Sequence, residues 1–320
     1  MSRLAPVLAV ALVALRAAPA RAEPLDLDLS RLGPPNAAVW THIETTTGVP
    51  LGAPAGVLAD DAKKRFAVLS SEFALLMSGP LLQPASTTGH AGFDVAFEAA
   101  YQPVHADAVG LADYGFTTSP WPTRGDAPSA VTTTGVHLRK ALPWSFELGG
   151  RLTNVNKASY FAAQGEAKWA LNEGFEKIPD FAVRIAYTRL FGQEHWNLGA
   201  TDLDFMVSKR WGVSAVTSFT PYFAFRYTYV RASSDAIDFQ SYSPPTPSEP
   251  PADQSAGVAT FPSLHAGLFR TTLGVRMTAS VVSMALEGTY LFGNDIQADD
   301  YPEFSVDSSF AAALKLGWEF

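Results

Sequence analysis

The chemically most suggestive pattern in this chain is a pair of aspartates, Asp202 and Asp204, separated by one residue. On a β-strand, residues two apart point to the same side, so the pair would present two neighbouring carboxylates. Such a pair could exchange protons with a substrate or hold a divalent cation. Arg184 and Arg226 lie on the two neighbouring candidate strands, and neighbours on one face of a sheet interact directly. We therefore favour salt bridges to these arginines over acid–base or metal chemistry.

The rest of the sequence offers few signals for an enzyme. It contains no H-E-x-x-H, G-x-S-x-G, P-loop or G-x-G-x-x-G motif. The absence of cysteine excludes disulfides and thiolate metal sites. A formal net charge of −8 without a Lys/Arg run argues against a nucleic-acid partner. We therefore expect no enzymatic activity, no catalytic residue, no metal and no cofactor.

Residues 293–307 form an acidic stretch whose carboxylates could bind Ca²⁺. The five acids are Asp295, Asp299, Asp300, Glu303 and Asp307. They do not follow the D-x-D-x-D-G spacing of an EF-hand loop, so we interpret the stretch as a solvated acidic loop.

From residue 91 onwards, apolar and polar residues alternate with the period of a β-strand. We predict ten strands, at residues 91–103, 129–142, 144–156, 158–171, 180–192, 197–211, 214–232, 263–278, 280–292 and 308–320. Strands of nine to eleven residues suffice to cross a bilayer when they are tilted. An even number of strands, joined alternately by short turns and mostly longer loops, is typical of outer-membrane barrels. The sequence therefore predicts an all-β fold: one transmembrane antiparallel up-and-down β-barrel of about ten strands over residues 91–320.

The last predicted strand carries the most specific signal. Its apolar face consists of Phe310, Ala312, Leu314, Leu316, Trp318 and Phe320. This face resembles the C-terminal strand of bacterial outer-membrane β-barrels, which typically ends in Phe and is read by the insertion machinery. The resemblance implies a place in the outer membrane of the Gram-negative envelope, with membrane lipid and the barrel-assembly machinery as partners. It also implies that Leu316, Trp318 and Phe320 form the assembly signal.

The polar faces of the strands would line the barrel lumen with eight acids and eight bases. These are Asp94, Glu98, Arg139, Glu147, Arg151, Glu166, Lys168, Arg184, Asp202, Asp204, Arg226, Arg270, Arg276, Glu287, Lys315 and Glu319. A charge in a narrow lumen is costly unless it is paired, so equal numbers predict a mutually neutralising, filled interior. The alternative is an ion-lined channel. A barrel of about eight strands only just has room for its inward side chains, and open aqueous pores need about sixteen strands. The diameter of a barrel of about ten strands therefore favours the filled interior.

The first 90 residues have a different character. Residues 1–22 read as a cleavable signal peptide, with Arg3, an apolar run over residues 4–15 and the A-x-A site Ala20-Arg21-Ala22. Residues 23–90 would form a periplasmic or lumenal lead. Within it, residues 61–78 have helical spacing between an N-cap at Asp60 and a stop at Gly79-Pro80. We expect this helix to cover the periplasmic mouth, because its apolar residues need a surface that a charged lumen does not offer.

Two functions fit these features. The first is passive transport of a small solute through a porin-like barrel that is narrow or plugged. The second is a structural or surface-binding barrel that presents the loops 104–128, 233–262 and 293–307 to a surface ligand. A less favoured third function is a membrane-embedded hydrolase similar to the omptin proteases, which would need acids and histidines clustered at the outer rim. Only His195, Asp202 and His265 are candidates for that role.

Overall fold

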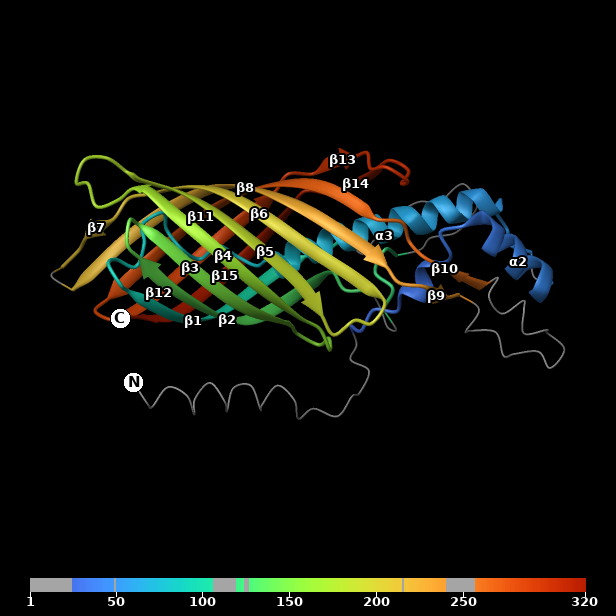
Figure 1. The fold of residues 1–320 in the computed structure, drawn as a ribbon, viewed down its shortest axis with the longest axis horizontal. Coiled ribbons are helices and arrows are strands. Elements are labelled where there is room, and N and C mark those ends of the chain that lie inside the picture. Colours follow the sequence, from blue (N-terminus) through green and yellow to red (C-terminus); the bar gives the residue numbers. More distant parts are fainter. Residues whose placement is uncertain (1–24, 49, 106–118, 124–126, 215, 240–256) are drawn as a thin grey trace.

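The computed structural model describes residues 25–48, 50–105, 119–123, 127–214, 216–239 and 257–320, so the predicted signal peptide lies outside the described residues. The main body is a closed β-barrel (Figure 1). Its ten strands are β1 (Phe93–Pro103), β2 (Ala130–Leu142), β3 (Phe146–Val155), β4 (Phe161–Asn172), β5 (Asp180–Phe191), β6 (Trp196–Ser208), β8 (Thr217–Ser234), β11 (Leu264–Ala279), β12 (Val282–Leu291) and β15 (Ser309–Glu319).

Each barrel strand pairs antiparallel with the next strand along the chain, and the barrel closes where β15 pairs with β1. The pairing of β8 with β11 completes a continuous ring of hydrogen bonds. A two-residue element, β7 (Trp211–Gly212), pairs with the start of β8. All ten predicted strands are present, with ends within three residues of their predicted bounds. The predicted fold class is confirmed.

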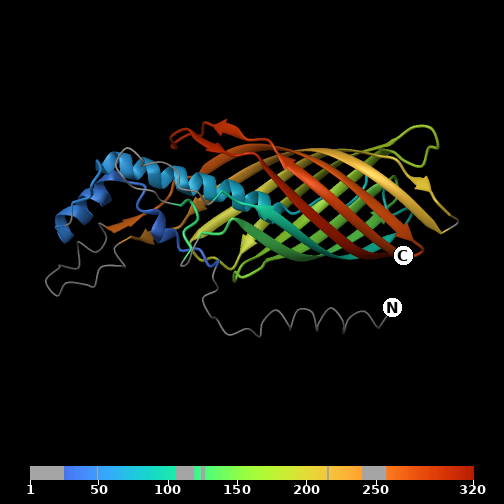
Figure 2. The ribbon, with the colours of Figure 1, turned by 180° about the vertical axis from the view of Figure 1, so that it is seen from behind.

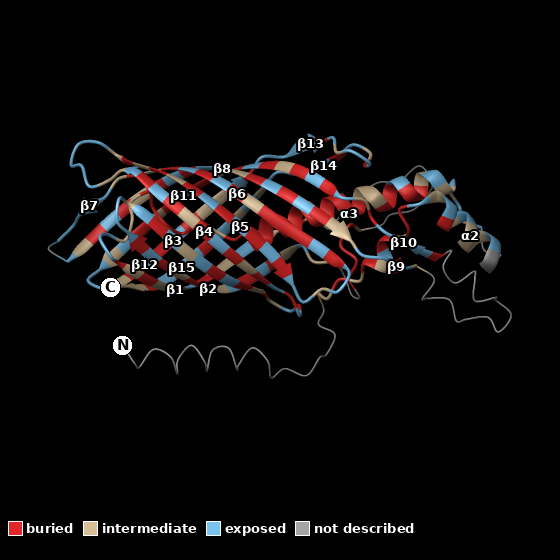
Figure 3. Cartoon of the chain, viewed as in Figure 1, coloured by how far each residue is buried: buried red, intermediate tan, exposed pale blue. Residues whose placement is uncertain are grey.

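The two faces of the barrel wall differ as the alternating sequence requires (Figure 3). On β15, for example, Leu314 is 55% exposed, whereas the next residue, Lys315, is 2% exposed. Large aromatic side chains stack on the outer face, such as Phe146 on Trp169 with ring centroids 5.6 Å apart. A continuous apolar outer surface with aromatic residues is the surface that a bilayer requires of a barrel.

Within residues 25–92, three helices precede the barrel: η1 (Leu29–Leu32), α2 (Ala37–Thr47) and α3 (Ala55–Ser78). The side chain of Asn36 caps α2 by accepting a hydrogen bond from Ala38 N. Helix α3 starts earlier than predicted, after Pro54 and without a side-chain cap, so the predicted cap at Asp60 is wrong. It ends at Gly79, as predicted, because glycine adopts the positive φ of 67° there at no steric cost. None of the described helices is both long enough and apolar enough to span a membrane.

The two ends of the barrel are distinct. At the end that we call the terminus end, Phe93 N donates to Phe320 O over 2.9 Å, which joins the first and last residues of the barrel wall. At the other end, the loop end, lie the described parts of the connections 104–128 and 233–262, together with the connection 293–307. Helix α3 projects from the loop end (Figure 2). Our expectation that the helix covers the mouth next to the C-terminal strand end is therefore wrong: it lies at the opposite mouth.

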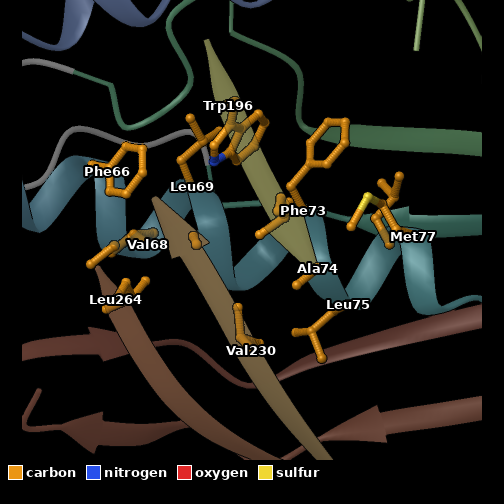
Figure 4. Packing of buried hydrophobic residues seen from close by; sticks show 14 of the residues in the cluster. Phe66, Val68, Leu69, Phe73, Ala74, Leu75, Met77, Trp196, Val230 and Leu264 are labelled. Carbon is orange, nitrogen blue, oxygen red and sulfur yellow. The ribbon is translucent and has the colours of Figure 1, made fainter. Parts of the chain in front are cut away.

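Helix α3 is the centre of a compact unit at the loop end, which we call the cap. The cap comprises residues 25–78 and two small hairpins, β9 (Ile237–Asp238) with β10 (Val258–Ala259), and β13 (Asn294–Ile296) with β14 (Phe304–Val306). Its core is apolar (Figure 4). Phe66 stacks on Phe261 at 4.3 Å between ring centroids, and Phe73 lies 5.1 Å from Trp196. The apolar face of α3 thus finds its surface among loop residues and the rim of the barrel.

The acidic stretch 293–307 is part of this cap. Its five carboxylates are exposed, as expected of a solvated loop. Ile296, Phe304 and Val306 are buried, and Tyr301 donates a hydrogen bond to Pro262 O over 2.6 Å. Burial, aided by the nearby Asp300 carboxylate, raises the pKa of Tyr301 well above its usual value. The Tyr301 phenol therefore stays protonated and keeps donating its hydrogen bond, which joins the connection 293–307 to Pro262.

Candidate functional site in the barrel lumen

The structure places the sixteen predicted charged residues on the inner face of the wall. Fifteen of them are buried, and Glu319 is partly exposed at the terminus end. No lipid or bulk solvent can solvate charges at such depth, so each depends on partners within the protein.

Towards the terminus end, Asp94 is shared by two bases. Its Oδ2 accepts from Arg139 and from Lys315, the latter over 2.6 Å. Arg139 also reaches Glu147 at 3.2 Å, and Glu147 contacts Lys168 at 2.9 Å. Acids and bases thus alternate across β15, β1, β2, β3 and β4, which is the ladder that equal charge numbers predict.

Halfway along the lumen, a histidine absent from the predicted set joins two acids. His137 Nδ1 lies 2.9 Å from Glu98 Oε1, and its Nε2 lies 3.0 Å from Glu166 Oε1. Arg151 completes the group through a 2.8 Å contact with Glu98. His137 and Arg139 are two residues apart on β2 and therefore lie on the same, lumenal face. This spacing is the sequence feature that predicts the position of His137.

Asp202 and Asp204 have different partners. Asp204 accepts from both Arg184 and Arg226, as predicted, with Arg184 Nη2 at 2.7 Å from Oδ2. Asp202 instead pairs with Arg270 of β11 at 3.0 Å and accepts from Thr228 over 2.6 Å. Both carboxylates are therefore engaged in ion pairs. Within the described ranges, no group of three or more histidine and acidic side chains is placed to hold a metal ion.

The main feature that sequence reasoning missed is the course of residues 79–92, which we call the threaded segment. Leu81 N and Leu82 N donate to the two oxygens of Glu287, over 2.8 and 2.5 Å. Gln83 bridges Glu166 and Arg139, at 3.1 and 2.9 Å. Further along, Ala85 N donates to Ser208 Oγ over 3.1 Å, and Thr88 N donates to Glu147 over 3.0 Å. The segment therefore runs inside the barrel and is held by the lumenal charges themselves.

The threaded segment separates two hollows. The loop-end hollow lies between the end of α3 and strands β12, β15, β1 and β2, and is lined by Leu75, Pro80, Ala100 and Arg270 among others. The terminus-end hollow is lined by Thr87, Glu173, Lys209, Arg276 and Glu319 among others. Between the two, residues 81–85 are buried. The lumen is therefore filled at mid-depth by chain as well as by side chains.

The candidate rim residues for a hydrolase are not brought together. Asp202 is fully buried inside the lumen, while His265 lies on the outer face and contacts Tyr229 OH at 2.8 Å through its Nδ1. His195 is exposed in the connection before β6. These three side chains do not form a nucleophile–base arrangement.

No protein-family model matches the sequence, and no curated protein matches it. Among solved structures, the chain is similar to the outer membrane protein OprG from Pseudomonas aeruginosa, at 12% identity over 74% of this chain and 99% of that chain, with a TM-score of 0.30. It is also similar to Ail, the attachment invasion locus protein of Yersinia pestis, at 8% identity over 72% of this chain and 100% of that chain, with a TM-score of 0.26. The KdgM porin matches at 7% identity over 69% of this chain and 97% of that chain, with a TM-score of 0.27.

Proposed function

We propose that this protein is a plugged outer-membrane barrel whose role is to hold the cap at its loop end, a scaffold rather than an open pore. The observation that carries the proposal is the burial of residues 81–85 between the two hollows. Ten strands enclose a space little wider than the side chains that point into it. The ion-pair ladder and the threaded segment take up that space. No enzymatic step is part of this proposal.

Passive transport is the second candidate, favoured by the presence of a hollow on each side of the threaded segment. In that case the segment would act as a removable plug. Glu287 is its main anchor, because both of its oxygens accept backbone N–H groups from the segment. Loosening this anchor would then open a route.

Single-channel recording in planar bilayers separates these functions. We expect the unmodified protein to give only small or rare conductance steps, and Glu287→Gln to behave in the same way. Thr41→Gln on the exposed face of α2 serves as the matched control. Steps that appear only with Glu287→Gln would favour gated transport. Large, steady conductance from the unmodified protein would contradict the scaffold proposal.

We also propose that Leu316, Trp318 and Phe320 form the signal that the barrel-assembly machinery reads. Phe320 is exposed on the outer face and its backbone closes the ring against Phe93. Removing Phe320 should lower the fraction of protein that reaches the heat-modifiable folded form in outer membranes, measured by gel mobility. A Phe320→Tyr variant, which keeps the terminal aromatic, should assemble normally. Unchanged folded yield after deletion would count against the signal.

A further inference from the structure

The positions of the cap and of the barrel termini raise a question of topology. The wall begins at Phe93 and ends at Phe320, and both lie at the terminus end. Residues 25–72, as far as the structure describes them, lie at the loop end, where Trp121 Nε1 donates to Glu72 of α3 over 2.7 Å. Figures 1 and 2 show the cap and the C-terminus at opposite ends of the barrel. The chain must therefore travel the length of the barrel between the middle of α3 and Phe93, and Ser78 at the end of α3 is already inside the lumen, where Gln164 Nε2 donates to Ser78 O over 2.8 Å.

This passage runs through the lumen. Leu81, Gln83 and Ala85 are fully buried and contact side chains on the inner face of the wall. The segment 79–92 contains fourteen residues, which can extend to about 46 Å at about 3.3 Å per residue. The apolar band of an outer-membrane barrel is about 25 Å tall. The length is therefore sufficient for the segment to connect one side of the membrane to the other.

We propose that residues 25–72 stand on the opposite side of the membrane from Phe320, on the outer face of the cell, and that they reach this side through the lumen of their own barrel. The orientation rests on the proposed outer-membrane location, in which the short turns of the terminus end face the periplasm and the longer connections of the loop end face outwards. It does not rest on whether the finished barrel conducts ions.

The passage must come before the lumen is filled. A helix with its side chains is about 10 Å across, and the finished lumen is occupied by the charge ladder and the threaded segment. The ring of strands is hydrogen-bonded at both β8–β11 and β15–β1, so no seam is left for a lateral entry once it has closed. The cap segment therefore crosses while the barrel is forming, and the ladder then closes on the segment that trails behind it.

The cap core supports this order of events. Phe66 and Phe73 of α3 pack against Phe261, Trp121 and Trp196, which come from the loop end of the barrel. On the periplasmic side these partners would not be available. The helix can therefore bury its apolar face only after it has arrived at the loop end, which holds it there.

Cysteine labelling tests the topology directly, because the chain contains no cysteine of its own. Thr41→Cys places a unique thiol on the exposed face of α2, and Glu176→Cys places one in the exposed turn between β4 and β5 at the terminus end. A membrane-impermeant maleimide is applied to intact cells and to lysed cells. Folding of each variant is checked by heat-modifiable gel mobility, and Thr45→Cys repeats the test at a second exposed position of α2.

We expect both α2 variants to be labelled equally in intact and lysed cells, and Glu176→Cys to be labelled only after lysis. Protection of Thr41→Cys and Thr45→Cys in intact cells, with labelling only after lysis, would overturn the inference. The readout is independent of conductance. A protein that conducts ions but shows the expected labelling would contradict the scaffold function and leave the topology intact.

Discussion

Replacing Asp204 with asparagine should destabilise the folded barrel by about 3–5 kcal/mol, the usual cost of removing one partner from a buried ion pair. Asp204 is fully buried, and its two oxygens are shared by Arg184 and Arg226. Arg184 would keep its ion pair with Glu166. Within the described part of the chain, Arg226 would keep only its hydrogen bond to the carbonyl oxygen of Gly79, at 2.9 Å. A buried guanidinium charge would be left without a carboxylate. The urea midpoint of unfolding in lipid vesicles measures the loss.

Glu319→Gln is the matched control for this substitution. Glu319 also pairs with an arginine, Arg276, at 3.1 Å, but its side chain is 16% exposed at the barrel end. Water can replace its contribution, so the expected cost is below about 1 kcal/mol. Equal losses for Asp204→Asn and Glu319→Gln would show that depth in the lumen does not determine the strength of these pairs.

Replacing Phe73 with aspartate should release the cap while the barrel stays folded. Phe73 is 1% exposed, and its ring centroid lies 5.1 Å from that of Trp196, 5.9 Å from that of Trp121 and 6.1 Å from that of Tyr160. Losing a buried Phe side chain costs about 3–5 kcal/mol, and an unpaired carboxylate in the same apolar site adds to that loss. The wall strands keep their own hydrogen bonds, so the effect should be local.

Limited proteolysis followed by mass spectrometry measures this release. We expect new cleavage within residues 37–78 and an intact barrel fragment. Thr41→Asp introduces the same charge at an exposed position of α2 and should leave the protease pattern unchanged. An unchanged pattern for Phe73→Asp, or simultaneous loss of the barrel fragment, would contradict the assignment of Phe73 to a separate cap core.

The barrel could be predicted from the sequence because both of its faces are determined residue by residue. Leu314 and Lys315 must point to lipid and to the lumen, and a shift of one residue would exchange them. The same parity placed Asp204 between Arg184 and Arg226, because these residues stand on adjacent strands. The alternation within each strand and the order of the strands are therefore enough to predict which wall residues face the lumen and which of them pair.

The cap and the threaded segment could not be predicted in the same way. The partner of Asp202 on β6 is Arg270 on β11, and β8 lies between these two strands. The long arginine side chain crosses that distance inside the lumen, so strand pairing does not predict the contact. Leu81 and Leu82 bind Glu287 through their backbone N–H groups. Every residue except proline has such a group, so the residue types do not predict the contact. The spacing of α3 indicated a helix with an apolar face, but the end of the barrel that offers a matching surface depends on the fold of the distant loops.

The threaded segment occupies the lumen, and a disulfide between this segment and the barrel wall tests that placement. Ala85 N lies 3.1 Å from Ser208 Oγ, so the two residues are adjacent within the barrel. The double variant Ala85→Cys/Ser208→Cys should form a disulfide on mild oxidation, seen as altered mobility on a denaturing, non-reducing gel. Ala85→Cys/Thr133→Cys, whose second position lines the loop-end hollow, should not. Failure of the first pair to cross-link, in protein that is folded by heat-modifiable mobility, would contradict a lumen filled by residues 79–92.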